Sequence, residues 1–306
     1  MFRILLKLAF PSRITDGFVT ENSQTALALR RLRQNKIGML GLGILVGYIL
    51  VALVGPLLVT TDPNAIHASQ RLQAPGLAHP FGTDRYGRDV FARTVIAARA
   101  NLKVATIVVA SSTVGGVTLG LLAGYYQGSV DEAIMRVVDV LFAFPHLLLG
   151  LVIIAILGPG LNKAIIALSI AYVPVMIRIT RGSAISVSNE EYVLAAESYG
   201  ESPWNIMFRD MLPNLLSAVL VQATIIFAFS TLTEAGLSYL GLSAQPPTIT
   251  WGVMISEAQQ TLQIAPWASF FPGLAIMITV LGLTFFGVGL RDALDPKTDI
   301  DLQEGR

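Results

Sequence analysis

Few residues of this chain could do chemistry alone, and their spacing matches no catalytic pattern. The histidines His67, His79 and His146 lie far apart, without the spacing of metal ligands. The chain has no cysteine, which excludes disulfides, zinc–thiolate sites and a cysteine nucleophile. It also lacks a Gly-x-x-x-x-Gly-Lys-Ser/Thr phosphate loop and a Gly-x-Ser-x-Gly nucleophile elbow. We therefore expect no catalysis by this chain, no bound metal, and a structural role for His146.

Three charged side chains within apolar segments are the remaining candidates. Asp139 follows Arg136 at i+3, a spacing that allows an ion pair on one helix face. A charge at the centre of a membrane helix costs about 2.5–3.5 kcal/mol, and less toward the interface. We expect Arg136 and Asp139 to form a structural pair, with a proton relay as the alternative. Glu234 is a weaker candidate for lining a path.

The elements that would position these residues are apolar helices. The chain is 53% hydrophobic and 13% charged, with a mean hydropathy of +0.64. An average soluble domain carries about 25% charged residues, so an integral membrane protein is indicated. The net charge of +1 gives no sign of a nucleic-acid partner. The spans also lack the series of acidic residues that a proton-coupled carrier often has. We therefore expect the energy for any transport to come from another protein.

Six segments match the length of about 20 apolar residues that a spanning helix needs. The sequence thus predicts an all-α integral membrane chain with six transmembrane helices. The fourth segment contains Pro174, which membrane helices tolerate where neighbours satisfy the freed carbonyl. The expected spans are residues 37–59, 102–126, 134–157, 163–179, 215–240 and 269–290.

The distribution of Lys and Arg predicts the orientation. With the N-terminus inside, 14 of the 21 basic residues are cytoplasmic and 7 are outside. Both termini are therefore expected in the cytoplasm, although the loop 60–101 carries five arginines on the outside. The expected parts are a cytoplasmic tail (1–36) with a basic interfacial helix, the first span (37–59), an extracytoplasmic loop (60–101), a five-helix core (102–291) with a cytoplasmic insert (188–213), and a second cytoplasmic tail (292–306).

Small residues recur at a spacing of four in two spans. Gly116, Gly120 and Gly124 share one helix face, and Gly43 and Gly47 share another. Such spacing lets helix backbones approach closely, so it predicts a helix or subunit contact. Glycine is also common in membrane helices, which is the alternative reading.

The insert 188–213 is polar, between very apolar neighbours. Ser188 and Glu191 have the spacing of a capping box, and the helix after them places Tyr192, Ala195, Ala196 and Tyr199 on one face. Gly200 stands where a left-handed residue would end that helix. We expect a docking surface for a protein partner, with a hairpin lying on the membrane surface as the alternative.

The second half of the insert predicts another short helix. Ser202 suits an N-cap and Pro203 the first helical position. The residues at i, i+3, i+4 and i+7 are Trp204, Met207, Phe208 and Met211, and Leu212-Pro213 leads into the fifth span. Two amphipathic helices of about ten residues each are marginal alone in water, so they must pack on something.

The order Ala195-Ala196, Gly200, Leu212-Pro213 resembles the "EAA" signature of ABC-importer permease subunits. Leu194 stands in place of the signature Glu, and Asp210 in place of an apolar residue. Longer stretches resemble the C-type subunit of the dipeptide/oligopeptide/nickel permeases, and the resemblance as a whole covers about residues 35–297. They are HPFGTDRYGRDVFAR at 79–93, AFP at 143–145, LGPG at 157–160, GLSAQPP at 241–247, WG at 251–252, FPG at 271–273 and GLRDALDP at 289–296.

The resemblance implies the type I importer permease fold in the plasma membrane of a prokaryote. It implies a pore shared with a B-type permease subunit, two cytoplasmic ATPase subunits that bind ATP and Mg, and an extracytoplasmic solute-binding protein. The cargo would be a dipeptide or oligopeptide, with nickel chelates, opines and other solutes as alternatives. The coupling residues would be Tyr192, Ala195, Ala196, Glu197, Tyr199, Gly200, Ser202, Pro203, Trp204, Leu212 and Pro213.

A self-contained secondary transporter or channel is the competing hypothesis. It needs a complete ion path in one chain and no ATPase partner. The sequence shows no clear inverted repeat of broken helices that would support it.

The segment from Asp84 to Asp89 lies in the expected outer loop and interleaves Arg with Asp. We expect local ion pairs and turns there, with a metal or the delivery protein as the alternative ligand.

Overall fold

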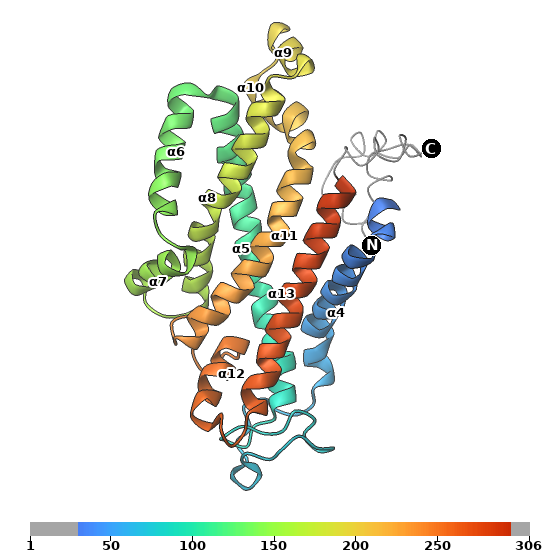
Figure 1. Ribbon diagram of the computed structural model, residues 1–306. Coiled ribbons are helices and arrows are strands. Elements are labelled where there is room, and N and C mark those ends of the chain that lie inside the picture. The colour runs from blue at the N-terminus through green and yellow to red at the C-terminus, as the bar shows by residue number, and fades with distance from the viewer. Residues whose placement is uncertain (1–29, 295–306) are drawn as a thin grey trace.

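The computed structural model describes residues 30–294, in which long helices run side by side between two ends (Figure 1). One end carries the short helices α9 and α10, and the opposite end carries the loop of residues 59–89. We call them the α9 end and the loop end. Across residues 30–294 no strand occurs, and one isolated bridge joins Thr83 to Asp89.

Within residues 30–294, five helices are long and apolar enough to cross a membrane, and the bent pair α6–α7 would make a sixth span. The five are α4 (Lys36–Leu58), α5 (Val90–Tyr126), α8 (Leu161–Ser188), α11 (Leu212–Tyr239) and α13 (Trp267–Leu294). The bent pair is α6 (Gly128–Phe142) and α7 (His146–Leu157). The short elements are the 3₁₀ turns η2 (Ala68–Gln70) and η4 (Gln259–Thr261), the helices α9 (Glu191–Ser198), α10 (Pro203–Asn205) and α12 (Trp251–Ala258), and the π-helical segment η3 (Ile206–Met211).

The expected spans are present, and two of their boundaries move. Helix α5 begins at Val90 instead of residue 102, because the Asp89 carboxylate caps it by accepting from the Ala92 N–H at 2.8 Å. Helix α8 continues through Pro174 to Ser188, well past residue 179. Most of the expected N-terminal interfacial helix and the tail after residue 294 lie outside the described residues.

The third expected span, residues 134–157, is present as two helices and not as one unbroken helix. Helices α6 and α7 meet at a bend of 89° around Pro145. Proline has no N–H to continue a helix, and it disfavours helical geometry in the residue before it. Helix α7 therefore lies across the bundle instead of extending α6 (Figure 1).

The glycine triplet of α5 marks a helix contact within the chain. A Cβ atom at Gly120 would lie 2.6 Å from the Cβ of Thr180, and Gly116 and Gly124 meet α8 in the same way. Gly43 and Gly47 make no such contact within the described part of the chain, where a Cβ atom on either would meet nothing within 4 Å, and a contact with another subunit stays a prediction. Helix α4 instead approaches α13 through other glycines, Gly38 and Gly41, against Gly289 and Gly282.

Candidate functional site

The insert forms a protrusion at the α9 end, beyond the long helices (Figure 1). Its first helix begins at Glu191, with Glu190 as an N-cap that makes no side-chain hydrogen bond. The expected capping box between Ser188 and Glu191 was therefore wrong. The Ser188 hydroxyl instead donates to the Ile185 carbonyl at 3.0 Å, because α8 extends to Ser188 and uses the hydroxyl in its own last turn.

Helix α9 buries one side and exposes the other. Val193 is fully buried, and Ala196 is half-buried against the core of the bundle. Tyr192, Ala195 and Tyr199 are exposed, as the sequence pattern requires of a docking face. Leu194, which stands where the EAA signature has Glu, is 49% exposed. The outer side of α9 is thus a shallow apolar surface between two tyrosines.

Gly200 ends α9 in the left-handed conformation that the sequence predicts. Its φ is +77°, its N–H donates to the Glu197 carbonyl at 3.0 Å, and the Glu201 N–H donates to the Ala196 carbonyl at 3.1 Å. These two bonds form a Schellman motif. A Cβ atom at Gly200 would meet nothing within 4 Å in the described residues, so backbone conformation, not space, favours glycine here.

The second half of the insert begins as expected and then departs from the helical pattern. The Ser202 hydroxyl accepts from the Asn205 N–H at 3.3 Å, and Pro203 occupies the first turn. The expected four-residue face was wrong, because residues 206–211 adopt π-helical geometry, whose wider turn shifts side chains relative to a 3.6-residue period. Met207 and Met211 are buried, whereas Trp204 is 60% exposed, with its ring centroid 4.2 Å from that of Phe208 and the two planes tilted by 34°.

Two side-chain contacts fasten α9 to the long helices. The Asn214 amide of α11 donates to the Tyr192 hydroxyl and to the Asp210 carbonyl, both at 2.8 Å. Glu197 hydrogen-bonds Tyr125 at the end of α5. Burial and the nearby carboxylates of Glu190 and Asp210 raise the pKa of Tyr192, so its hydroxyl stays protonated at neutral pH.

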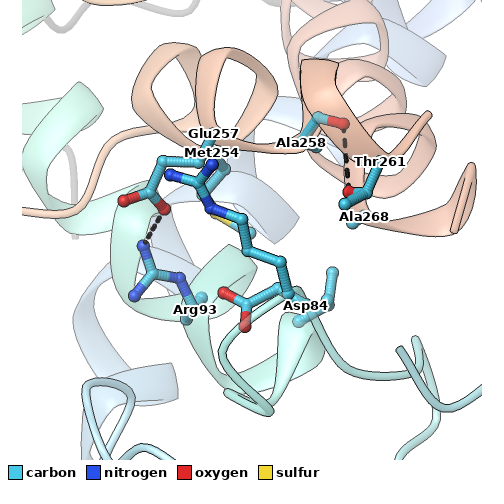
Figure 2. Close-up of a pocket in the computed structure, with 9 residues that line it drawn as sticks. Asp84, Arg93, Met254, Glu257, Ala258, Thr261 and Ala268 are labelled. Carbon is cyan, nitrogen blue, oxygen red and sulfur yellow. Dashed lines mark hydrogen bonds and ion pairs between the residues drawn. The ribbon is translucent and has the colours of Figure 1, made fainter. Parts of the chain in front are cut away.

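A cluster of ion pairs stabilises the loop end, and Figure 2 shows one of them, between Arg93 and Glu257. Arg88 binds Asp84 at 2.5 Å and Glu257 at 2.6 Å, and Arg93 binds the same Glu257 oxygen at 3.0 Å. Nearby, His79 pairs with Asp89 at 2.7 Å. The Asp84–Arg88 pair is a local ion pair of the kind expected of this segment, whereas the pairs with Glu257 come from a distant part of the chain. The adjoining cavity measures about 10 Å³, room for one water at most.

A metal at the loop end has no support in the geometry. Over the described part of the chain, no three His, Cys, Asp or Glu side chains come together as metal ligands would. The carboxylates of Asp84 and Glu257 are instead held by guanidinium groups.

The expected pair of Arg136 with Asp139 was wrong. Arg136 binds Glu132 at 2.6 Å, one turn away on α6, while Asp139 binds Arg178 of α8 at 2.8 Å. The Arg178 guanidinium also lies 4.0 Å from the Phe142 ring centroid, so α8 supplies a cation that local spacing cannot reveal.

Glu234 and His146 both pack within the bundle. Glu234 is 1% exposed and accepts from the Ser238 and Ser243 hydroxyls at 2.6 and 3.1 Å. It therefore lies inside the helix packing of this chain and not on an open surface. His146 packs edge-on against Tyr172 and beside Phe142, as expected of a structural residue.

Sequence reasoning missed two residues. Asn214 stabilises the α9 end, and Glu257 stabilises the loop end. Asn214 follows Leu212-Pro213 in the first turn of α11, a position where a polar side chain can reach back along the chain. Glu257 lies in a mainly apolar stretch, and only the five arginines of the 60–101 loop hinted that such a carboxylate was needed.

Comparison with known proteins gives consistent matches. Residues 116–300 match the family described as binding-protein-dependent transport system inner membrane component, and residues 23–75 match the N-terminal TM domain of oligopeptide transport permease C. A dipeptide transport system permease protein of Alkalihalophilus pseudofirmus is 45% identical over 270 residues, 88% of this chain and 89% of that protein. An oligopeptide transport system permease protein of Bacillus subtilis is 38% identical over 270 residues, 88% of each chain.

A solved structure shares the fold. The match is to inward-facing conformations of the MetNI methionine ABC transporter, with a TM-score of 0.56 and 17% identity over 66% of this chain and 96% of that one. From the helical bundle and these matches, the chain belongs to the family of binding-protein-dependent transport system inner membrane components, the pore-forming permease subunits of ABC importers.

Proposed function

We propose that this chain is the C-type permease subunit of an ATP-driven importer for dipeptides or oligopeptides. A B-type permease subunit would complete the pore, two ATPase subunits would bind ATP and Mg, and a solute-binding protein would deliver the peptide. The relatives named for dipeptide and oligopeptide transport support this substrate class, since they align over 88% of this chain.

The coupling site of the proposal is the insert at the α9 end. The observation that carries it is the exposed face of α9, which ends in the Schellman corner at Gly200 and projects beyond the long helices. A rigid, shallow apolar surface of this kind can fit a groove on a partner protein. The contact surface comprises Tyr192, Ala195, Ala196, Glu197, Tyr199, Gly200, Ser202, Pro203 and Trp204, with Leu212 and Pro213 joining it to α11.

In this proposal the α9 end faces the cytoplasm, and the loop end faces the delivery protein. The excess of Lys and Arg assigned to the inner side supports that orientation. Closure of the ATPase dimer around ATP would displace α9, and rigid helices would carry the movement to the pore. Arg136, Asp139 and Glu234 would stabilise the helix packing and take no part in coupling.

Co-purification and transport test the proposal together. Tagged permease in mild detergent should bring down the second permease and the ATPase subunits encoded with it. The reconstituted complex should then import dipeptides only with ATP and the binding protein present. Uptake by this chain alone, driven by an ion gradient, would support the secondary-transporter hypothesis instead.

A further inference from the structure

Helix α9 is attached differently to its two neighbours in the chain. Toward α8, the connection passes through Asn189 and Glu190, which are not helical, and no side chain caps the start of α9. Toward α11, the chain continues as helix from Pro203 through the π-helical segment to Tyr239, and the Leu212 N–H donates to the Met207 carbonyl across their junction. The corner of residues 199–202 lies between α9 and this helix, and the two Schellman bonds and the Ser202 cap hold it in shape.

A side-chain hydrogen bond also joins the start of α9 directly to the start of α11. The Asn214 amide reaches back 22 residues along the chain to the Tyr192 hydroxyl. Its second hydrogen goes to the Asp210 carbonyl, so both amide hydrogens are used and the side chain has one favoured orientation. The first turn of α9 is thus held against the first turn of α11.

Apolar packing supports the same link. Val193 of α9 and Ile206, Met207 and Met211 of the π-helical segment are buried in one core cluster. Displacing α9 without α11 would break the Tyr192 bond and expose these side chains. Displacing both together would keep these contacts, although it would bend the Asn189–Glu190 connection and shift the packing against α5 and α8, whose side chains share the cluster. The second movement therefore retains contacts that the first would break.

We propose that Tyr192 and Asn214 are positioning residues that join the insert and α11 into one lever, hinged on α8 at Asn189 and Glu190. This inference rests on the proposed function, in which an ATPase subunit displaces α9. The displacement then passes to α11 through the hydrogen bond and the shared core. An ATPase subunit covering this end would also exclude water, which strengthens the bond.

The test uses the complete reconstituted transporter and compares Tyr192→Phe, Asn214→Leu and the double variant. Loss of one neutral hydrogen bond should lower peptide imported per ATP hydrolysed by about threefold to tenfold in each single variant. The double variant should be no worse than Asn214→Leu alone, because Asn214→Leu already removes the Tyr192 bond together with the bond to the Asp210 carbonyl. ATPase subunits should still co-purify with Asn214→Leu, which lies outside the proposed contact surface, and Tyr126→Phe, at a 51% exposed tyrosine of the same end, is the matched control.

Three results would overturn the lever. Unchanged import per ATP in both single variants would do so, as would additive losses in the double variant. Loss of ATPase binding in Asn214→Leu would make Asn214 a docking contact instead. If the unaltered transporter fails to couple ATP to peptide import, the proposed function fails; if it couples normally and the variants do too, only the lever fails.

Discussion

Glu257 is the anion that two guanidinium groups share at the loop end. Its side chain is 22% exposed, and those of Arg88 and Arg93 are 11% and 3% exposed. Replacing Glu257 with Gln should leave the two guanidiniums facing each other without their shared counter-charge. We expect the free energy of unfolding to fall by about 1–3 kcal/mol. This is less than the loss of a fully buried pair would cost, because the side chains are partly exposed. Thermal unfolding in detergent should show it as a lower midpoint.

The Arg136→Gln variant provides the contrast for Glu257→Gln. Arg136 and Glu132 are 78% and 65% exposed, so their pair should contribute about 0–1 kcal/mol. Equal destabilisation by the two variants would contradict the bracing role of Glu257.

Local sequence patterns predict ion pairs only when both partners lie in one element. The Asp84–Arg88 pair is such a case, at i and i+4, and it was anticipated. The pairs of Asp139 with Arg178 and of Arg93 with Glu257 join residues far apart in the chain, so they depend on helix packing that spacing does not encode.

The contact of α5 with α8 depends on glycine at three successive turns. A methyl group at Gly120 would be forced against Thr180, so Gly120→Ala should destabilise the bundle by about 1–3 kcal/mol. The neighbouring Gly115→Ala should be close to neutral, because its Cβ would lie 3.6 Å from Val173 at ordinary contact distance. The midpoints of heat-induced aggregation should separate the two variants, and an unaffected Gly120→Ala protein would refute the close packing.

Apolar length predicted the helices well and their interruptions poorly. All six expected segments are found among the described helices, because about 20 apolar residues have few alternatives in a bilayer. The sequence analysis did not predict the bend at Pro145, and Pro174 lies within a continuous helix. A proline alone therefore does not decide whether a helix is interrupted. In α8, Pro174 is buried among neighbouring helices. Around Pro145 the side chains are largely exposed, so packing does not hold the two helices in line.

The orientation of the bundle can be tested with single cysteines, since the chain has none of its own. Leu77→Cys, at a fully exposed site in the loop, should react with a membrane-impermeant maleimide in intact cells. Gly182→Cys in α8, where a side chain would meet nothing within 4 Å in the described residues, should resist that reagent in intact cells. The reverse pattern would place the α9 end outside.

The family and its fold could be recognised from motifs spread over most of the chain, and the helical bundle agrees with them. The multi-pass arrangement fits a protein of the bacterial plasma membrane. The shape of the insert was only partly predictable. Capping residues and Gly200 determine its corner locally, whereas the π-helical segment and the bond from Tyr192 to Asn214 arise from packing against the bundle.

The amount of peptide imported per ATP hydrolysed, measured on reconstituted Gly200→Val transporter, tests the central claim most directly. Valine at a φ of +77° is strained by at least about 1–2 kcal/mol, so it should distort the corner and lower the ratio about tenfold while ATP hydrolysis continues. Gly200→Asn, which tolerates this conformation, should keep the ratio near that of the unaltered transporter. An unchanged ratio in Gly200→Val would contradict the assignment of this corner to ATP-driven coupling.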